Sequence, residues 1–142
     1  MSRRRSLWVP HPAEVYVIAE ADTEAFTSSA EVLQVVTSDG QTLKVKKQQC
    51  VEIADADSLI EQCDDLILLR EVNEATILHT LRGRFKQDKI YTAIGTVLVS
   101  LNPFRPIEGL YEKATVLQYT KAMYSHTHDT LPPHVFVIAA SA

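Results

Sequence analysis

Cysteine is rare in this sequence of 142 residues. Cys50 and Cys63 are the only two, and their separation fits no metal-binding or redox motif. A small secreted scaffold held together by disulfides would need more cysteines than this. We therefore expect two reduced, partly buried thiols.

Long apolar runs and an excess of basic charge are also missing. No run approaches the roughly 20 residues that span a bilayer, and the N-terminus has no apolar signal-peptide core. With 14 basic and 18 acidic residues the formal charge is −4, so no general attraction to nucleic acid or anionic membrane is expected. Arg3, Arg4 and Arg5 are interpreted as a solvated tail. These absences predict a cytoplasmic protein with no membrane insertion and no nucleic-acid partner.

Glycine is scarce too, with four in the chain. A phosphate-binding P-loop needs a second glycine five residues after the first, then lysine and serine or threonine, because backbone N–H groups and an ammonium hold the phosphates. The residues found at that distance from Gly40, Gly83, Gly95 and Gly109 are Val45, Asp88, Ser100 and Ala114. These 142 residues therefore contain no P-loop.

A β-rich block covers residues 7–54. Val32–Thr37 is β-prone, Thr42–Lys46 alternates strictly between polar and apolar residues, and Asp39-Gly40 is typical of a two-residue hairpin loop. The polar stretch Asp22–Ser29 is predicted to be a loop. Four or five short strands in such a block predict a small antiparallel β-barrel, which carries no paired nucleophile and base.

Acidic residues then dominate residues 55–63, with Asp55, Asp57 and Glu61 among them. An acidic stretch between two apolar-patterned regions favours a linker with a short helical turn. We expect a domain boundary near residue 55.

Residues 64–142 mix helical and β patterns. Asn73 suits a helix start, and the following helix of about ten residues is predicted to stop near Gly83. Two β runs, Ile90–Thr92 and Val97–Leu101, are separated by Gly95, which suggests a bulge or bend.

Two further helices are predicted after the β runs, over Glu112–Tyr124 and from His134 to Ala142. His126, His128 and His134 lie in or beside the connection, but their spacing matches no metal-ligand motif. We therefore expect no metal there.

The Asn102-Pro103 pair ends the second β run, because proline lacks an N–H and disfavours helix at the residue before it. The Asn102 amide can both donate and accept hydrogen bonds, which suits the edge of a purine. The alternative from the spacing alone is that Asn-Pro merely starts a turn.

These residues together resemble the start of the myosin motor domain, over about residues 64–142. The segments that carry the resemblance are Asp65-Leu66 with Leu69, Asn73-Glu74, Ile77-Leu78, Leu81–Phe85, Ile90–Thr92, Ile94-Gly95, Leu98-Val99, Asn102–Phe104, His134–Phe136 and Ile138-Ala139. The preceding block, beginning with Trp8-Val9-Pro10, is similar to the Src-homology-3-like N-terminal barrel of several myosin classes.

The resemblance implies an α+β chain: a small antiparallel β-barrel over 7–54, an acidic linker over 55–63, and over 64–142 the incomplete N-terminal part of an α/β P-loop motor domain. Myosins are actin-based motors that hydrolyse ATP with Mg²⁺, and they are cytoplasmic and cytoskeleton-associated. In them a purine-binding loop runs from an Asn-Pro pair to a tyrosine. Asn102, Pro103 and Tyr111 match that motif, and Arg105 lies where the family often has a basic residue.

The resemblance also implies that this chain is an N-terminal fragment ending before the P-loop. It would then contribute the purine-binding loop without being competent for hydrolysis alone, bind neither ATP nor Mg²⁺ tightly, and lack the actin-binding regions of the full-length family. The alternative hypothesis is a non-catalytic protein-interaction module built on the N-terminal barrel.

Overall fold

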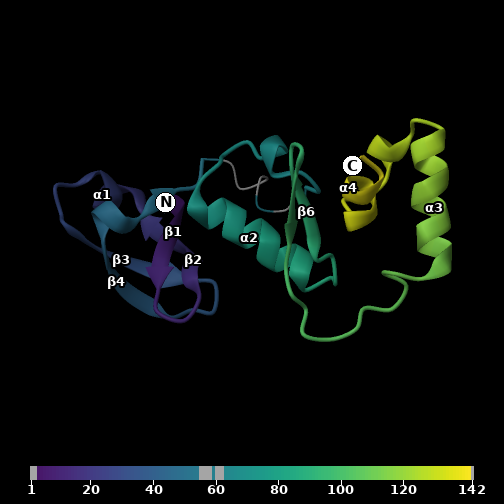
Figure 1. Cartoon of the computed structure of the whole chain (residues 1–142). Helices are drawn as coiled ribbons and strands as arrows, with labels where there is room; N and C mark the ends of the chain where they lie inside the picture. The colour runs from purple at the N-terminus through teal and green to yellow at the C-terminus, as the bar shows by residue number, and fades with distance from the viewer. Residues whose placement is uncertain (1–2, 55–58, 60–62, 142) are drawn as a thin grey trace. The chain divides into compact units, whose positions relative to one another are not determined.

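The computed structural model describes residues 3–54, 59 and 63–141 (Figure 1). Antiparallel sheets and helices both occur, so the predicted α+β class is confirmed. The chain divides into two compact units, residues 1–57 and 58–142. Most of the predicted acidic linker lies outside the described residues. Among the residues that are described, no helix has the length and apolar character needed to cross a bilayer.

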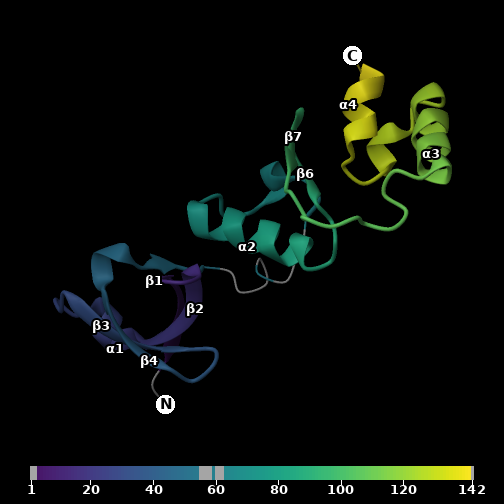
Figure 2. The ribbon, with the colours of Figure 1, turned by 60° about the horizontal axis from the view of Figure 1, so that its bottom comes forward.

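A single antiparallel sheet makes up most of the N-terminal unit. Its strands, in the spatial order β4-β3-β2-β1-β5, are β1 (Arg4–His11), β2 (Val15–Asp22), β3 (Val32–Thr37), β4 (Thr42–Lys46) and β5 (Val51–Glu52), with a 3₁₀ turn η1 (Lys47–Gln49) before β5. Figure 2 shows the sheet curving round on itself.

The core of this unit lies on the inner face of the curved sheet. The predicted alternation in β4 is confirmed, since Val45 is buried and Leu43 packs against the core while Thr42, Lys44 and Lys46 are exposed. Seven buried residues from four strands form one cluster: Leu7, Val9, Ala19, Ala21, Leu33, Val35 and Val45. Removing this apolar surface from water is the main stabilisation of the unit.

The predicted loop at Asp22–Ser29 is wrong over its centre, where a short helix α1 (Thr23–Thr27) forms. The Asp22 carboxylate accepts the backbone N–H of Glu24 at 2.8 Å, which caps the first turn. Polar composition suggested a loop, but an N-cap aspartate is itself a helix start signal.

The arginine tail begins the first strand instead of being wholly solvated. Arg4 and Arg5 belong to β1. The Arg4 guanidinium pairs with Glu20 at 3.0 Å, and that of Arg5 pairs with Glu52.

The hairpin between β3 and β4 differs from the predicted two-residue loop, because Thr37 pairs with Gln41 and leaves a three-residue loop. In that loop only Gly40 has a positive φ, 82°, where a type I turn followed by a left-handed residue requires it.

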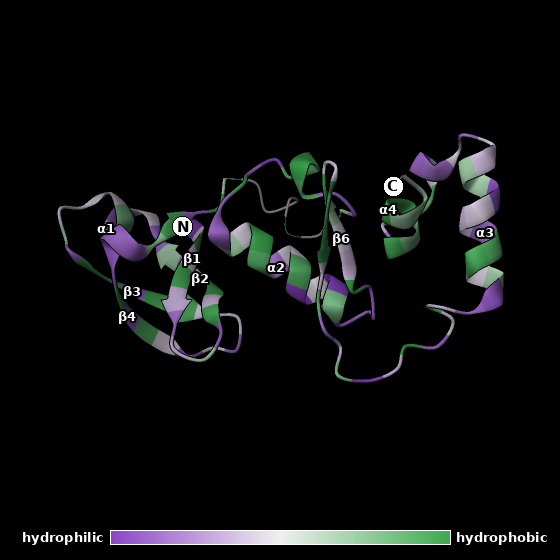
Figure 3. Cartoon of the chain, viewed as in Figure 1, coloured by the Kyte–Doolittle hydropathy of each residue, from purple (hydrophilic) through white to green (hydrophobic). Residues whose placement is uncertain are grey.

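The C-terminal unit consists of short helices and one hairpin. Its elements are η3 (Leu66–Leu68), α2 (Glu74–Phe85), β6 (Tyr91–Ile94), β7 (Val97–Ser100), α3 (Lys113–Tyr124), η4 (His128–Thr130) and α4 (Val135–Ser141). Strands β6 and β7 pair antiparallel. Figure 3 shows α4 as strongly apolar along its length.

One prediction about glycine in this unit is wrong, because Gly83 lies inside α2, which continues to Phe85 and so has 12 residues. Of the bulge or bend predicted at Gly95, only the bulge is wrong. With Thr96, Gly95 forms the tight turn of the β6–β7 hairpin, and its φ of 58° suits the first position of such a loop. The Asn73 cap is confirmed, because its side chain accepts the Thr76 N–H at 2.9 Å.

The buried face of α2 is polar. Ile77, Leu78 and Leu81 are only partly buried, whereas Thr76, Thr80 and Arg84 are nearly inaccessible. The Arg84 guanidinium donates to the Thr92 hydroxyl at 2.9 Å and the Tyr91 carbonyl at 2.7 Å, and it pairs with Asp64. Arg84 therefore joins α2 to β6 through donors that its fixed planar group can aim at several acceptors.

Candidate functional site

The predicted purine-binding loop, Asn102 to Tyr111, lies in the irregular segment between β7 and α3, residues 101–112 (Figure 1). Strand β7 ends at Ser100, two residues before the Asn102-Pro103 pair, and Asn102 is exposed. The segment has few backbone hydrogen bonds of its own, so side chains determine its path.

Asn102 and Phe104 form the start of the loop. The Asn102 Oδ1 accepts the Phe104 N–H at 2.8 Å, a local turn that does not use the donors of the amide NH₂. Phe104 has a φ of 52°, a region that costs a non-glycine residue energy, and its ring is 91% exposed. An exposed ring on a strained backbone is the kind of feature found at ligand contacts.

Arg105 pairs with a carboxylate in this structure. Its guanidinium contacts Asp88 Oδ1, and Asp88 lies just before β6 with a φ of 62°. The hydrogen bond from Arg105 lowers the pKa of the Asp88 carboxyl, and the same contact raises the pKa of Arg105. The pair is exposed, so Arg105 can exchange Asp88 for another acceptor at small cost.

Tyr111, which is 57% exposed, ends the loop. Its hydroxyl lies 2.5 Å from the hydroxyl of Tyr91, which is buried on β6. Burial first, and then this hydrogen bond, raise the pKa of Tyr91 to about 12. The Tyr91 phenol therefore stays protonated at neutral pH and can share the hydrogen bond with the Tyr111 hydroxyl.

His134 lies behind Tyr111 and is 4% exposed. Its Nδ1 accepts the backbone N–H of Phe136 at 3.1 Å, so its Nε2 carries the hydrogen and donates to the Leu110 carbonyl at 2.9 Å. Burial lowers the pKa of His134, while the Leu110 contact opposes that change. The imidazole is therefore neutral and joins the loop to the start of α4.

Aromatic rings surround this histidine. The ring of Tyr91 lies 5.0 Å from it, that of Tyr119 at 4.8 Å, that of Phe136 at 4.3 Å and that of Tyr111 at 5.9 Å. We call Tyr91, Tyr111, Tyr119, His134 and Phe136 the His134 cluster. Such tilted and edge-on pairs add to apolar burial and fix relative orientation.

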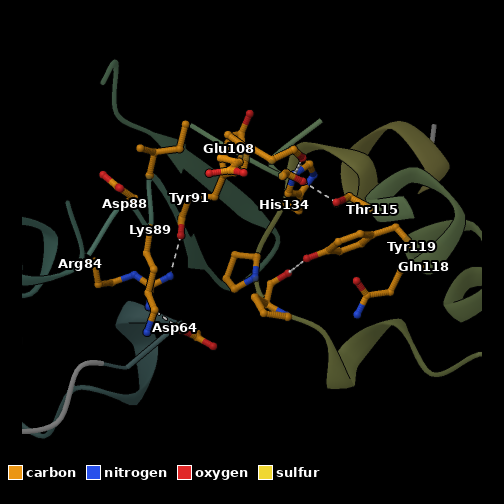
Figure 4. Close-up of a pocket in the computed structure, with 15 residues that line it drawn as sticks. Asp64, Arg84, Asp88, Lys89, Tyr91, Glu108, Thr115, Gln118, Tyr119 and His134 are labelled. Atoms are coloured by element: carbon orange, nitrogen blue, oxygen red, sulfur yellow. Dashed lines mark hydrogen bonds and ion pairs between the residues drawn. The ribbon is translucent and has the colours of Figure 1, made fainter. Parts of the chain in front are cut away.

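A cavity of about 440 Å³ adjoins the cluster (Figure 4). Tyr91, Tyr119 and His134 line it together with polar groups, among them Asp64 and Lys89. Asn102, Pro103, Arg105 and Tyr111 do not line it. The cavity lies behind the loop, whereas the predicted site residues are on the loop itself.

No group of three or more His, Cys, Asp or Glu residues in the described part of the chain is arranged to hold a metal ion. Of the three histidines considered from the sequence, His126 is exposed, His128 pairs with its neighbour Asp129 at 3.3 Å, and His134 is used in the cluster. The structure brings none of them together with the others as a ligand set.

Sequence reasoning overlooked Tyr91, Phe104 and His134 as parts of the site. The sequence analysis places Tyr91 in a β run and His134 at the start of a helix, and it assigns neither residue to the purine-binding loop. The available signal was that all three lie in the segments that carry the family resemblance, Ile90–Thr92, Asn102–Phe104 and His134–Phe136.

Comparison with known proteins identifies the family of this chain. The family model described as "Myosin head (motor domain)" matches residues 63–142, more than half of the chain. The chain therefore belongs to the myosin family.

Curated relatives match along nearly the whole chain. The high molecular weight form of myosin-1 of Acanthamoeba castellanii is 35% identical over 143 residues, covering 96% of this chain and 8% of the relative. Myosin-4 of Saccharomyces cerevisiae is 29% identical, covering 95% and 9%, and unconventional myosin-VI of Sus scrofa is 30% identical, covering 100% and 11%. The chain thus spans about a tenth of the length of these relatives.

Proposed function

We propose that residues 102–111 form the adenine-side wall of the ATP site in an actin-based myosin motor. The observation that supports this most directly is Tyr111, a residue that is more than half exposed although its hydroxyl is held at 2.5 Å by a buried partner. An exposed aromatic face fixed in one orientation is what a purine needs to stack on.

The other loop residues fit complementary roles. Pro103 fixes the backbone direction at the end of β7. The Asn102 amide donates toward the ring nitrogens of adenine, and Arg105, once released from Asp88, supplies a positive charge on the same loop. The loop thus binds the base and leaves the phosphates to other residues.

The 142 residues do not suffice for hydrolysis under this proposal. They contain no P-loop, and the described residues offer no carboxylate cluster for Mg²⁺. ATP and Mg²⁺ therefore bind this chain weakly, and actin binding and cytoskeletal association belong to a longer motor. The division into a Src-homology-3-like barrel (7–54), a linker (55–63) and a motor segment (64–142) is part of the same proposal.

A matched pair of ligands tests the adenine wall. Base stacking of about 1–3 kcal/mol alone corresponds to dissociation constants of roughly 6 to 200 mM, which NMR titration of the isotope-labelled chain can detect. AMP should shift the Asn102 side-chain amide and the Tyr111 ring signals, whereas ribose 5-phosphate, which lacks only the base, should not. Equal shifts with both ligands, or none with AMP, would contradict the proposal.

Two exposed tyrosines provide the control variants. Tyr111→Ala removes the proposed stacking surface, and Tyr124→Ala removes a ring that is 85% exposed on α3. The AMP-specific shifts at Asn102 should be lost in the first variant and kept in the second. Loss of the shifts in both variants would point to unspecific stacking.

A further inference from the structure

The C-terminal end of the loop is held from behind by three contacts. Thr115 donates to the Gly109 carbonyl, His134 donates to the Leu110 carbonyl at 2.9 Å, and the Tyr91 hydroxyl pairs with that of Tyr111 at 2.5 Å. Three consecutive residues of an otherwise irregular segment are thus anchored to α3, to the start of α4 and to β6. Figure 4 shows Tyr91, Thr115 and His134, the residues that provide these anchors.

Two of these anchors are buried polar groups. Tyr91 is 6% exposed and His134 is 4% exposed, and each contributes its polar atoms to the loop. Burying such groups costs free energy unless their hydrogen bonds are made. The buried groups therefore need the Tyr111 hydroxyl and the Leu110 carbonyl as hydrogen-bond partners, and this need restricts where the loop can lie.

Their contacts to Tyr111 restrict different motions. The Tyr91 hydroxyl fixes the tip of the Tyr111 ring, and the edge contacts of that ring with His134 and Phe136, at 5.9 and 6.2 Å between centroids, restrict its rotation. Because His134 also binds the adjacent carbonyl, backbone and ring are held together.

We infer that Tyr91 and His134 are positioning residues that hold the Tyr111 ring in the orientation in which it receives a planar base. The inference rests on the proposed adenine wall. Neither residue touches the base; both act through Tyr111. They order the Tyr111 ring already in the unbound chain, so that less conformational entropy is lost when the base binds.

Tyr119 supplies a matched control for Tyr91. Both tyrosines are 6% exposed and both rings pack on His134, but the Tyr119 hydroxyl donates to the Pro132 carbonyl at 2.7 Å and not to Tyr111. Tyr91→Phe and Tyr119→Phe each remove one buried hydroxyl and keep the ring. Similar losses of stability are expected, but only the first variant releases Tyr111.

The decisive readout is the NMR signal of the Tyr111 ring in the full 142-residue chain, first without ligand. In Tyr91→Phe it should move toward its position in the unfolded chain, and the initial slope of its shift against AMP concentration should fall about three- to tenfold, the effect of losing one ordering hydrogen bond. Tyr119→Phe should leave both quantities within error of the wild type.

Two variants test His134. His134→Leu removes the donor to Leu110 and should shift the Tyr111 ring signals; His134→Gln keeps a side-chain N–H donor and should restore part of the wild-type pattern. If His134→Leu fails to fold, the comparison of Tyr91→Phe with Tyr119→Phe still tests the inference. Unchanged Tyr111 signals in Tyr91→Phe, or equal changes in both tyrosine variants, would overturn the inference.

Failure of the proposed function gives a different result. If wild-type protein responds equally to AMP and ribose 5-phosphate, the adenine wall is wrong. The ligand-free Tyr111 signals still show whether Tyr91 and His134 position that ring.

Discussion

The two compact units bury different kinds of side chain. In the N-terminal unit, seven apolar residues form one core, and Thr37 is the only buried polar residue among those described. In the C-terminal unit the buried polar residues are Thr76, Thr80, Arg84, Thr92 and His134. The first unit is specified by an apolar pattern that closes on itself, and the second by hydrogen bonds between particular partners.

The largest expected effect tests the apolar core. Leu33→Ala should lower the unfolding free energy of the N-terminal unit by about 2–5 kcal/mol, because Leu33 is 1% exposed and its loss leaves a cavity. Trp8, the only tryptophan in the chain, is buried in the same unit, so its fluorescence follows that unit in a denaturant titration.

The neighbouring Val32→Ala is the control for this prediction. Val32 is 53% exposed on the same strand, and its truncation should change the midpoint little. Equal effects of the two variants would mean that the alternation in β3 does not define the core.

The next largest effect tests the polar interior. Arg84→Ala should destabilise the C-terminal unit by about 2–4 kcal/mol, because the Thr92 hydroxyl and the Tyr91 carbonyl lose a buried donor. Hydrogen exchange of the β6 amides measures this directly.

Arg84→Lys should recover little, since an ammonium cannot reach three acceptors in a fixed plane. Lys86→Ala, which truncates an exposed residue at the end of α2, is the surface control. In Arg84→Ala, the unfolding free energy from Trp8 fluorescence and that from hydrogen exchange of the β6 amides are compared. Equal losses in the two free energies would remove the distinction between the two units.

The smallest effect is a pH dependence confined to the second unit. The folded state holds His134 neutral and its pKa is lowered, so protons bind the unfolded chain preferentially. Stability should be constant above about pH 6.5 and fall below it, by at most about 1.4 kcal/mol per pH unit for one proton. The groups that share its cavity include Tyr91, Tyr119, Asp64, Arg84, Asp88, Lys89 and Glu108.

Thermal unfolding at pH 7.5 and 5.5, followed by NMR signals of the C-terminal unit, measures this slope. His134→Gln should flatten it, whereas His126→Gln, at an exposed position, should keep it. An unchanged slope in His134→Gln would show that another group carries the pH dependence.

The same contrast explains what the sequence could predict. The alternation of Thr42–Lys46 and the β-prone Val32–Thr37 predicted their strands correctly, because a period of two is visible in the residues themselves. The helix over α3 was predicted from a mixed apolar stripe, and the Asn73 cap from the capping preference of asparagine. The short helix α1 was missed because five residues, of which only Phe26 is large and apolar, are too few to show a period.

The candidate site was less predictable. Asn102 and Tyr111 were found through family resemblance, and the structure places both on one exposed loop. Nothing local in the sequence shows that His134 donates to Leu110, 24 residues earlier, or that Tyr91 meets Tyr111. Such partners depend on how helices and strands pack, which a periodic pattern does not encode.

The most direct test of the central claim compares ATP with AMP on the purified chain. Because the loop binds the base and holds one exposed arginine, it should bind ATP less than about tenfold more tightly than AMP, and the chain should show no ATPase activity above background with or without actin. Affinity for ATP at least about tenfold above that for AMP, equivalent to about 1.4 kcal/mol of phosphate binding, or measurable turnover, would contradict the account.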